Sequence, residues 1–174
     1  MKLIIIFAFL IPTLPFKNIS SKLPENEMEQ VIQKLIVNRS ADIEKIEELF
    51  NIKMQIDSAS STPFFSVYKW NSEKSELPFH SMELRLPIPE SKAADECLAI
   101  FKLPIQNRYT KEYVNEHFGD SIQVVPPRQG QLDEQITYYR ISGKDYTLSF
   151  GFSNNQNSSS TIVLNYAIES RILH

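Results

Sequence analysis

The sequence predicts an α+β fold made of two helix-plus-antiparallel-sheet units in tandem, with the helices packed on the sheet. Three observations favour this fold. Apolar residues recur with helical spacing over residues 25–50, and the period then changes to two. The same order, a capped short helix followed by alternating strands, returns after Thr110. With 174 residues, 42% hydrophobic and 22% charged, the chain has the composition of a globular protein and a length that allows one domain or two very small ones.

The first predicted unit covers residues 22–109 and begins with two helices. A helix over 25–39 places Met28, Val31, Ile32, Leu35 and Ile36 on one apolar stripe. Asp42 precedes a second apolar stripe, and its short carboxylate suits the N-cap of a helix over 43–50. Alternating apolar and polar residues then predict strands over 64–70, 80–86 and 96–103.

The second predicted unit covers residues 110–174. Thr110 is placed to cap a short helix over 111–118, and Gly119 suits its C-terminal end. Three further alternating segments predict strands over 136–141, 146–152 and 162–168. A true duplication would explain this order, but so would the ordinary succession of helices and hairpins in an α+β protein.

Residues 1–21 are predicted to be a signal peptide, because one early positive charge is followed by about a dozen mostly apolar residues. Pro12, Pro15 and Lys17 interrupt this run before the roughly 20 apolar residues that a membrane-spanning helix needs. We expect cleavage after Ser21, a periplasmic or secreted location, and no membrane span after removal of the signal. An uncleaved anchor and a buried first strand are the alternatives.

Few residues in the chain could carry catalysis. Cys97, with His80 or His117 as its base, is the only combination for a thiol nucleophile, but its apolar strand favours a small buried side chain. A pair of carboxylates could instead perform acid–base chemistry, although the acids of the second predicted helix read as a solvated face. The candidate acids are Asp42, Glu44, Glu47, Glu48, Asp133 and Glu134.

No metal site and no cofactor is predicted. His80, His117 and His174 have no spacing typical of metal ligands, so we expect the first two to be half-buried core residues. The four glycines form no phosphate-binding loop. Because the net charge is −3 and no block of lysine and arginine occurs, we expect no nucleic-acid partner.

Aromatic residues are the one feature that points to binding. They occur on both sides of the predicted strand 64–70, and Tyr138 and Tyr139 pose the same conflict in a later strand. A bulge, or helices on both faces of the sheet, would bury them all. Exposed tyrosine and tryptophan rings are instead typical of protein-binding surfaces. We therefore predict that Tyr68, Trp70 and Tyr139 contact another protein.

Residues 110–119 carry the pattern Thr-x-x-x-Val-x-x-x-Phe-Gly, which is followed by antiparallel strands. In a small exported protein this layout, over residues 40–169, resembles the SmpA/BamE-type envelope domains and the tandem β-lactamase-inhibitor-protein-like fold. The resemblance implies a module that binds another protein with its sheet or loops. We expect a non-enzymatic exported binding protein, acting as an inhibitor, an immunity-like protein or an assembly factor. The alternative is a small exported hydrolase using Cys97 or an acid pair.

Overall fold

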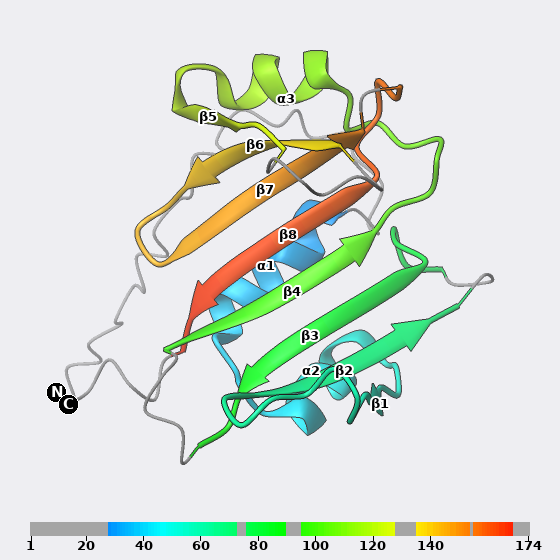
Figure 1. Cartoon of the computed structure of the whole chain (residues 1–174), viewed down its shortest axis with the longest axis vertical. Helices are drawn as coiled ribbons and strands as arrows, with labels where there is room; N and C mark the ends of the chain where they lie inside the picture. The colour runs from blue at the N-terminus through cyan, green and yellow to red at the C-terminus, as the bar shows by residue number, and fades with distance from the viewer. Residues whose placement is uncertain (1–27, 73–75, 90–94, 128–134, 154, 169–174) are drawn as a thin grey trace, which may run out of the picture.

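A computed structural model of the chain contains one eight-stranded antiparallel sheet and three α-helices in the part that it describes. Figure 1 looks onto the sheet, with the first two helices behind it and the third at its upper end. None of the helices in this part of the chain is long and apolar enough to cross a membrane. The described residues are 28–72, 76–89, 95–127, 135–153 and 155–168.

The first two helices form where the apolar spacing predicts them, as α1 (Met28–Asn38) and α2 (Ile43–Phe50). The predicted apolar stripe of α1 is buried along its whole length. The Asp42 carboxylate accepts a hydrogen bond of 3.0 Å from the Glu44 N–H, which confirms the predicted N-cap of α2. Asn51 ends the helix in the left-handed conformation, with φ 52° and ψ 48°.

The third helix, α3 (Lys111–Phe118), also has its predicted bounds. The Thr110 hydroxyl oxygen accepts a hydrogen bond of 3.1 Å from the Tyr113 N–H, and Gly119 follows with a positive φ of 38°. A single 3₁₀ turn, η1 (Gly119–Ser121), joins the helix to the next strand.

Six strands lie within one or two residues of their predicted positions. The two outermost strands of the sheet, β1 and β5, were not predicted, because two and four residues are too few to show a clear alternation. The strands are β1 (Gln55–Ile56), β2 (Phe65–Asn71), β3 (Ser81–Pro87), β4 (Glu96–Lys102), β5 (Ile122–Val125), β6 (Ile136–Ser142), β7 (Tyr146–Ser153) and β8 (Thr161–Ala167).

The predicted arrangement of two tandem helix-plus-sheet units is wrong. All eight strands form one sheet in the order β1-β2-β3-β4-β8-β7-β6-β5, with every neighbouring pair antiparallel. Strands β4 and β8, from the two predicted units, pair along their full length, and α1 packs against β8. Alternation in a sequence tells which side chains share a face, but it does not tell which strands become neighbours.

The predicted signal peptide, residues 1–21, lies outside the described residues.

The pairing register divides the strand residues between two faces, because directly opposite residues point to the same side. We call the first the helix face, since α1, α2 and α3 all pack on it. One row across it is Trp70, Met82, Phe101, Ile162, Phe150 and Tyr139.

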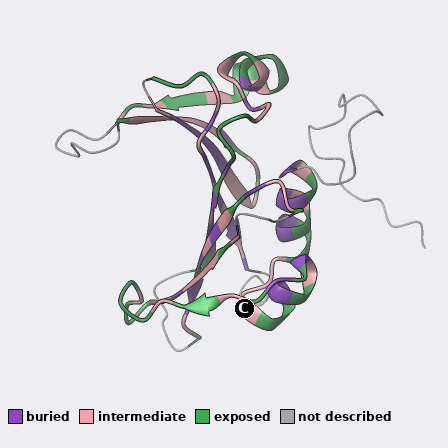
Figure 2. Cartoon of the chain, turned by 90° about the vertical axis from the view of Figure 1, so that its right-hand side faces the viewer, coloured by how far each residue is buried: buried purple, intermediate pink, exposed green. Residues whose placement is uncertain are grey.

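We call the second the open face, since no helix of the described chain lies over it (Figure 2). One row across it is Lys69, Glu83, Ile100, Val163, Ser149, Arg140 and Gln123. Every strand contributes to both faces, so residues adjacent in sequence point to opposite sides of the sheet.

Candidate functional site

The three predicted binding residues, Tyr68, Trp70 and Tyr139, lie on the helix face and are half-buried. The Trp70 ring meets Phe79 edge to face at 5.6 Å between centroids, and the Tyr139 ring meets Phe152 in the same way at 5.0 Å. Strands β3, β4, β8 and β7 separate Trp70 from Tyr139, so the structure does not bring the three rings together. Their role in a contact surface stays a prediction.

The adjacent rings of Tyr138 and Tyr139 in β6 lie on different faces of the sheet. Tyr138 points to the open face and Tyr139 points to the helix face. The Tyr138 ring lies over Gly151, the residue opposite it on β7. A Cβ atom at Gly151 would stand 2.9 Å from this ring and 3.0 Å from Ile136 Cγ2. The absence of a side chain at Gly151 therefore gives the ring its place on the sheet.

Cys97 lies on the helix face with no exposed surface. Its sulfur is 3.8 Å from the Ser40 carbonyl oxygen, and the Tyr166 hydroxyl is its second polar neighbour. Burial raises the pKa of the Cys97 thiol to about 11, so almost no thiolate forms at neutral pH. These are the features of a core thiol, and they weigh against the hydrolase that would use Cys97 as its nucleophile.

The expectation that the histidines are half-buried is wrong for the two that the structure describes. His80 follows a turn and is exposed, and His117 is exposed on α3, where its ring stacks on Tyr113 at 3.9 Å between centroids. His174 lies outside the described residues. Among the described residues, no three histidine, cysteine or acidic side chains converge as ligands for a metal ion.

The four candidate acids that the structure describes lie in or directly before α2. Glu44 and Glu48 are exposed, as expected for a solvated face, while Asp42 caps α2. Glu47 differs from that expectation, because it is nearly buried and accepts hydrogen bonds from Lys53 Nζ at 2.6 Å and from the Met54 N–H at 2.7 Å. These bonds lower the pKa of Glu47. Asp133 and Glu134 lie outside the described residues.

A polar cluster that the sequence did not reveal joins α1 to α3 and to the segment before it. The Glu29 carboxylate accepts hydrogen bonds from Arg108 Nη2 at 2.6 Å, from the Tyr109 hydroxyl at 2.7 Å and from the Tyr113 hydroxyl at 2.9 Å. Burial alone would raise the pKa of Glu29, but the bonds from Tyr109 and Arg108 leave it below its ordinary value. We call this cluster the Glu29 clasp. Its partners are 79 to 84 residues apart in sequence, so no local pattern could have indicated it.

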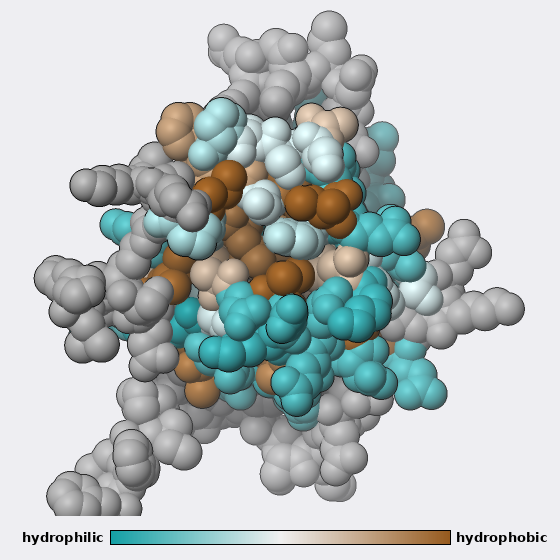
Figure 3. Space-filling model, turned by 90° about the horizontal axis from the view of Figure 1, so that it is seen from below, coloured by the Kyte–Doolittle hydropathy of each residue, from teal (hydrophilic) through white to brown (hydrophobic). Residues whose placement is uncertain are grey.

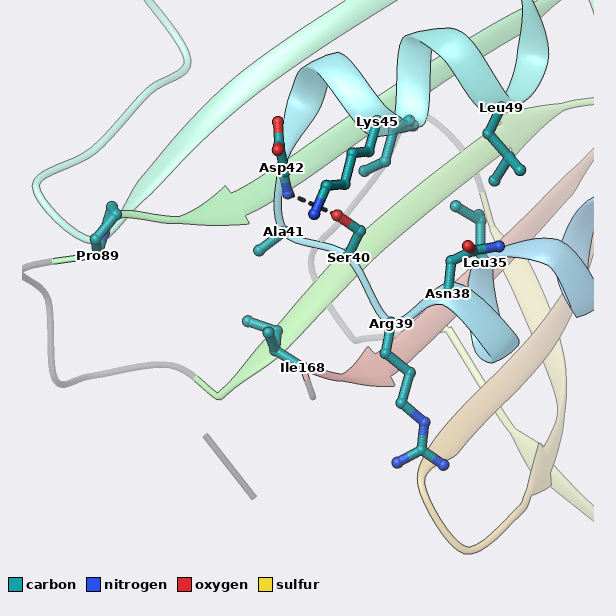
Figure 4. Close-up of a pocket in the computed structure, with 11 residues that line it drawn as sticks. Leu35, Asn38, Arg39, Ser40, Ala41, Asp42, Lys45, Leu49, Pro89 and Ile168 are labelled. Carbon is teal, nitrogen blue, oxygen red and sulfur yellow. Dashed lines mark hydrogen bonds between the residues drawn. The ribbon is translucent and has the colours of Figure 1, made fainter. Parts of the chain in front are cut away.

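A groove of about 820 Å³ lies between the α1–α2 turn, Pro89 after β3 and Ile168 after β8 (Figure 4). Arg39, in this turn, has a positive backbone φ of 44°. Its side chain extends to the β6–β7 turn, where the guanidinium pairs with Asp145 at 2.6 Å. Pro89 and Ile168 are each the last described residue before a part of the chain that is not described. Its walls are Leu35, Asn38, Arg39, Ser40, Ala41, Asp42, Lys45, Ile46, Leu49, Pro89 and Ile168.

The end of the sheet that carries β1 and β2 exposes further apolar surface. Ile56 is 58% exposed and Phe64 is 52% exposed. Seen from this end, apolar residues lie beside a broad hydrophilic area (Figure 3).

The open face combines an apolar centre with charged surroundings. Leu98 and Ile100 on β4 and Val163 on β8 are half-buried at its middle, and Ile100 lies directly opposite Val163. The Glu83 carboxylate is 2.9 Å from Arg85 Nη2 and 3.9 Å from Lys69 Nζ. The basic strand residues on this face are Lys69, Arg85, Lys102 and Arg140, and the acidic ones are Glu83 and Glu96.

No family model matches the chain, and comparisons with curated proteins and with solved structures also give no match. The resemblance to the SmpA/BamE-type and β-lactamase-inhibitor-protein-like domains therefore stays a prediction. The open face is the candidate functional site on its geometry alone.

Proposed function

We propose that this chain is a small exported binding protein, without catalytic activity of its own, that holds a partner protein against the open face of its sheet. The observation that carries the proposal is the apolar centre of that face, at Leu98, Ile100 and Val163, over which no helix of the described chain lies. An apolar centre with a polar and charged rim is the usual anatomy of a protein–protein interface. An inhibitor, an immunity-like protein or an assembly factor would act by such a contact.

The position of this apolar centre in the sheet supports the proposal. Strands β4 and β8 are the two middle strands, with three further strands hydrogen-bonded on each side. Their backbones are therefore fixed before any partner arrives, so docking does not have to order them. Export of the chain is part of the proposal and depends on residues 1–21, which are not among the described residues.

The proposal is tested by capturing partners with a pair of matched lysine substitutions. Ile100→Lys places a charge at the centre of the open face. Val37→Lys makes a similar change on α1, where Val37 is 70% exposed on the other side of the sheet. Each tagged protein is expressed in its native host, cross-linked, and its bound proteins are identified by mass spectrometry after the fold has been checked by circular dichroism.

One stoichiometric partner that is captured by the parent chain and by Val37→Lys, but lost with Ile100→Lys, is the expected result. Retention of the same partner by folded Ile100→Lys would contradict docking at the open face. The absence of any stoichiometric partner of the parent chain would contradict the binding function itself.

A further inference from the structure

The open face is more basic than the chain as a whole. Its strand residues include four basic and two acidic side chains, whereas the complete chain has a formal net charge of −3. One of the two acidic side chains, Glu83, already lies between Arg85 and Lys69. Asp57, which pairs with Lys69 at the edge of this face, offsets one further positive charge. The small excess of basic side chains that remains favours an acidic surface over a basic one.

Arg140 stands out among the arginines that the structure describes. Arg39 pairs with Asp145, Arg85 with Glu83, and Arg108 with Glu29. Arg140 has no carboxylate partner within the described part of the chain. It lies half-buried in β6 on the open face, and the residues directly opposite it on the neighbouring strands, Ser149 and Gln123, are uncharged.

One guanidinium nitrogen of Arg140 also lacks a hydrogen bond. Its Nε is buried without any acceptor among the described residues. Thr161 Oγ1, in the same condition, also belongs to the open face. A buried polar atom without a hydrogen-bond partner is unfavourable. An arginine that lacks both an ion pair and a hydrogen bond at Nε can therefore gain stability by binding an anion.

We infer that the partner on the open face presents an acidic surface, and that Arg140 binds one of its carboxylates beside the apolar centre at Ile100 and Val163. The forked guanidinium matches a carboxylate with two parallel hydrogen bonds. Exclusion of water by the docked apolar residues strengthens this pair. The inference rests on the proposed function, because it assigns the chemistry of the partner at the same face.

The inference is tested by NMR titration of the ¹⁵N-labelled full chain with two defined peptides. The first is acetyl-Glu-Val-Glu-Val-Glu-amide, and the second replaces each glutamate by glutamine. We expect the acidic peptide to shift amide signals of Ile100, Arg140 and Val163, and to bind more weakly as salt is added. We expect Arg140→Gln to weaken this binding about tenfold, since it removes one charge-assisted pair.

Two further variants separate charge from geometry. Arg140→Lys keeps the charge but loses the fork, so its affinity for the acidic peptide should fall between those of the parent chain and Arg140→Gln. Lys45→Gln removes an exposed cation on α2, on the other side of the sheet, and should leave the affinity unchanged.

Three results would overturn the inference. Equal binding of both peptides at the open face would remove the acidic specificity while leaving a partner surface, and therefore the proposed function, in place. Shifts at the open face that are larger with a short oligothymidylate than with the acidic peptide would identify a phosphate partner instead. No shift of open-face signals with either peptide would remove the anion site at Arg140, and the partner capture described above would then decide the proposed function separately.

Discussion

The two faces of the sheet are built from the same eight strands, but only one of them carries charged side chains and only the other carries the helices of the described chain. On the helix face the strand residues include no charged side chain in the described chain, and Leu84, Ala99 and Leu164 have no exposed surface. On the open face, their sequence neighbours Arg85, Ile100 and Val163 are exposed or half-buried. The comparison teaches that strand alternation sorts residues between the faces, while the helices decide which face becomes the core.

The comparison predicts its largest effect for substitutions at adjacent positions of β8. Leu164→Ala should lower the free energy of unfolding by about 3 kcal/mol, because it leaves a cavity in a closely packed core. Val163→Ala should lower it by about 1 kcal/mol or less, because Val163 is only half-buried and no helix of the described chain lies over it. Urea unfolding of both variants checks this. Similar losses in the two variants would mean that the open face is covered.

The Glu29 clasp holds the helix layer that makes the faces different, and its loss should have the second-largest effect. Glu29→Gln should lower the free energy of unfolding by about 2 kcal/mol at neutral pH, because it weakens three hydrogen bonds to a largely buried carboxylate. Since the pKa of Glu29 is lowered on folding, its contribution is present above the ordinary carboxylate pKa and is lost as the pH falls through the folded value.

Urea unfolding at neutral and acidic pH therefore tests both the size of the Glu29 contribution and the direction in which it changes with pH. The difference between the parent chain and Glu29→Gln should shrink in acid. Glu116→Gln, an exposed carboxylate on α3, is the control and should change little at either pH. A difference at Glu29 that does not depend on pH would contradict a charged clasp.

Packing on the open face should show a smaller effect. Gly151→Ala places a methyl group against the Tyr138 ring and should lower the free energy of unfolding by about 1 kcal/mol. Combining it with Tyr138→Ala should remove most of this loss, because the ring is the nearest obstacle. Thermal unfolding of the two single variants and the double variant gives the coupling. Additive losses would show that the ring does not rest on Gly151.

The charges at the β2 edge of the open face should contribute least. Asp57 is 2.5 Å from Lys69 Nζ, and the bonds from Lys69 and Ser60 lower the pKa of Asp57 from 3.8 to about 2. The stabilisation from Asp57 is therefore complete above its ordinary pKa and is lost as the pH falls from about 4 to about 2. A pH series of thermal unfolding should show Asp57→Asn converging with the parent chain in this window. A constant difference across the window would contradict the pair.

The local elements were predictable from the sequence because their causes are local. Asp42 and Thr110 cap helices through bonds to amides two or three residues away. The assembly was not predictable, because pairing of β4 with β8 joins residues far apart and leaves no periodic mark. Phe79 lies between two predicted strands and was assigned to no element, yet it is 1% exposed and its ring packs between Trp70 and Phe101.

The binding residues predicted from the sequence and the proposed site lie on opposite faces of the sheet. Aromatic content directed attention to Tyr68, Trp70 and Tyr139, whose rings the structure packs against the core. In the sequence, nothing distinguishes Ile100 and Arg140 from other strand residues. The pairing register of the strands places both on the face over which no described helix lies. Which face the helices cover depends on where α1 crosses β8, and that contact is set by tertiary packing.

Occupation of the open face inside the native host is the most direct test of the account. In a Cys97→Ala background, Val163→Cys, Leu164→Cys and Val37→Cys each offer one thiol for a labelling reagent. The account predicts that Val163→Cys and Val37→Cys react in the purified chain while Leu164→Cys does not, and that Val163→Cys alone becomes protected in the native host. Equal labelling of Val163→Cys in both settings, or none in the purified chain, would contradict a partner docked on the open face.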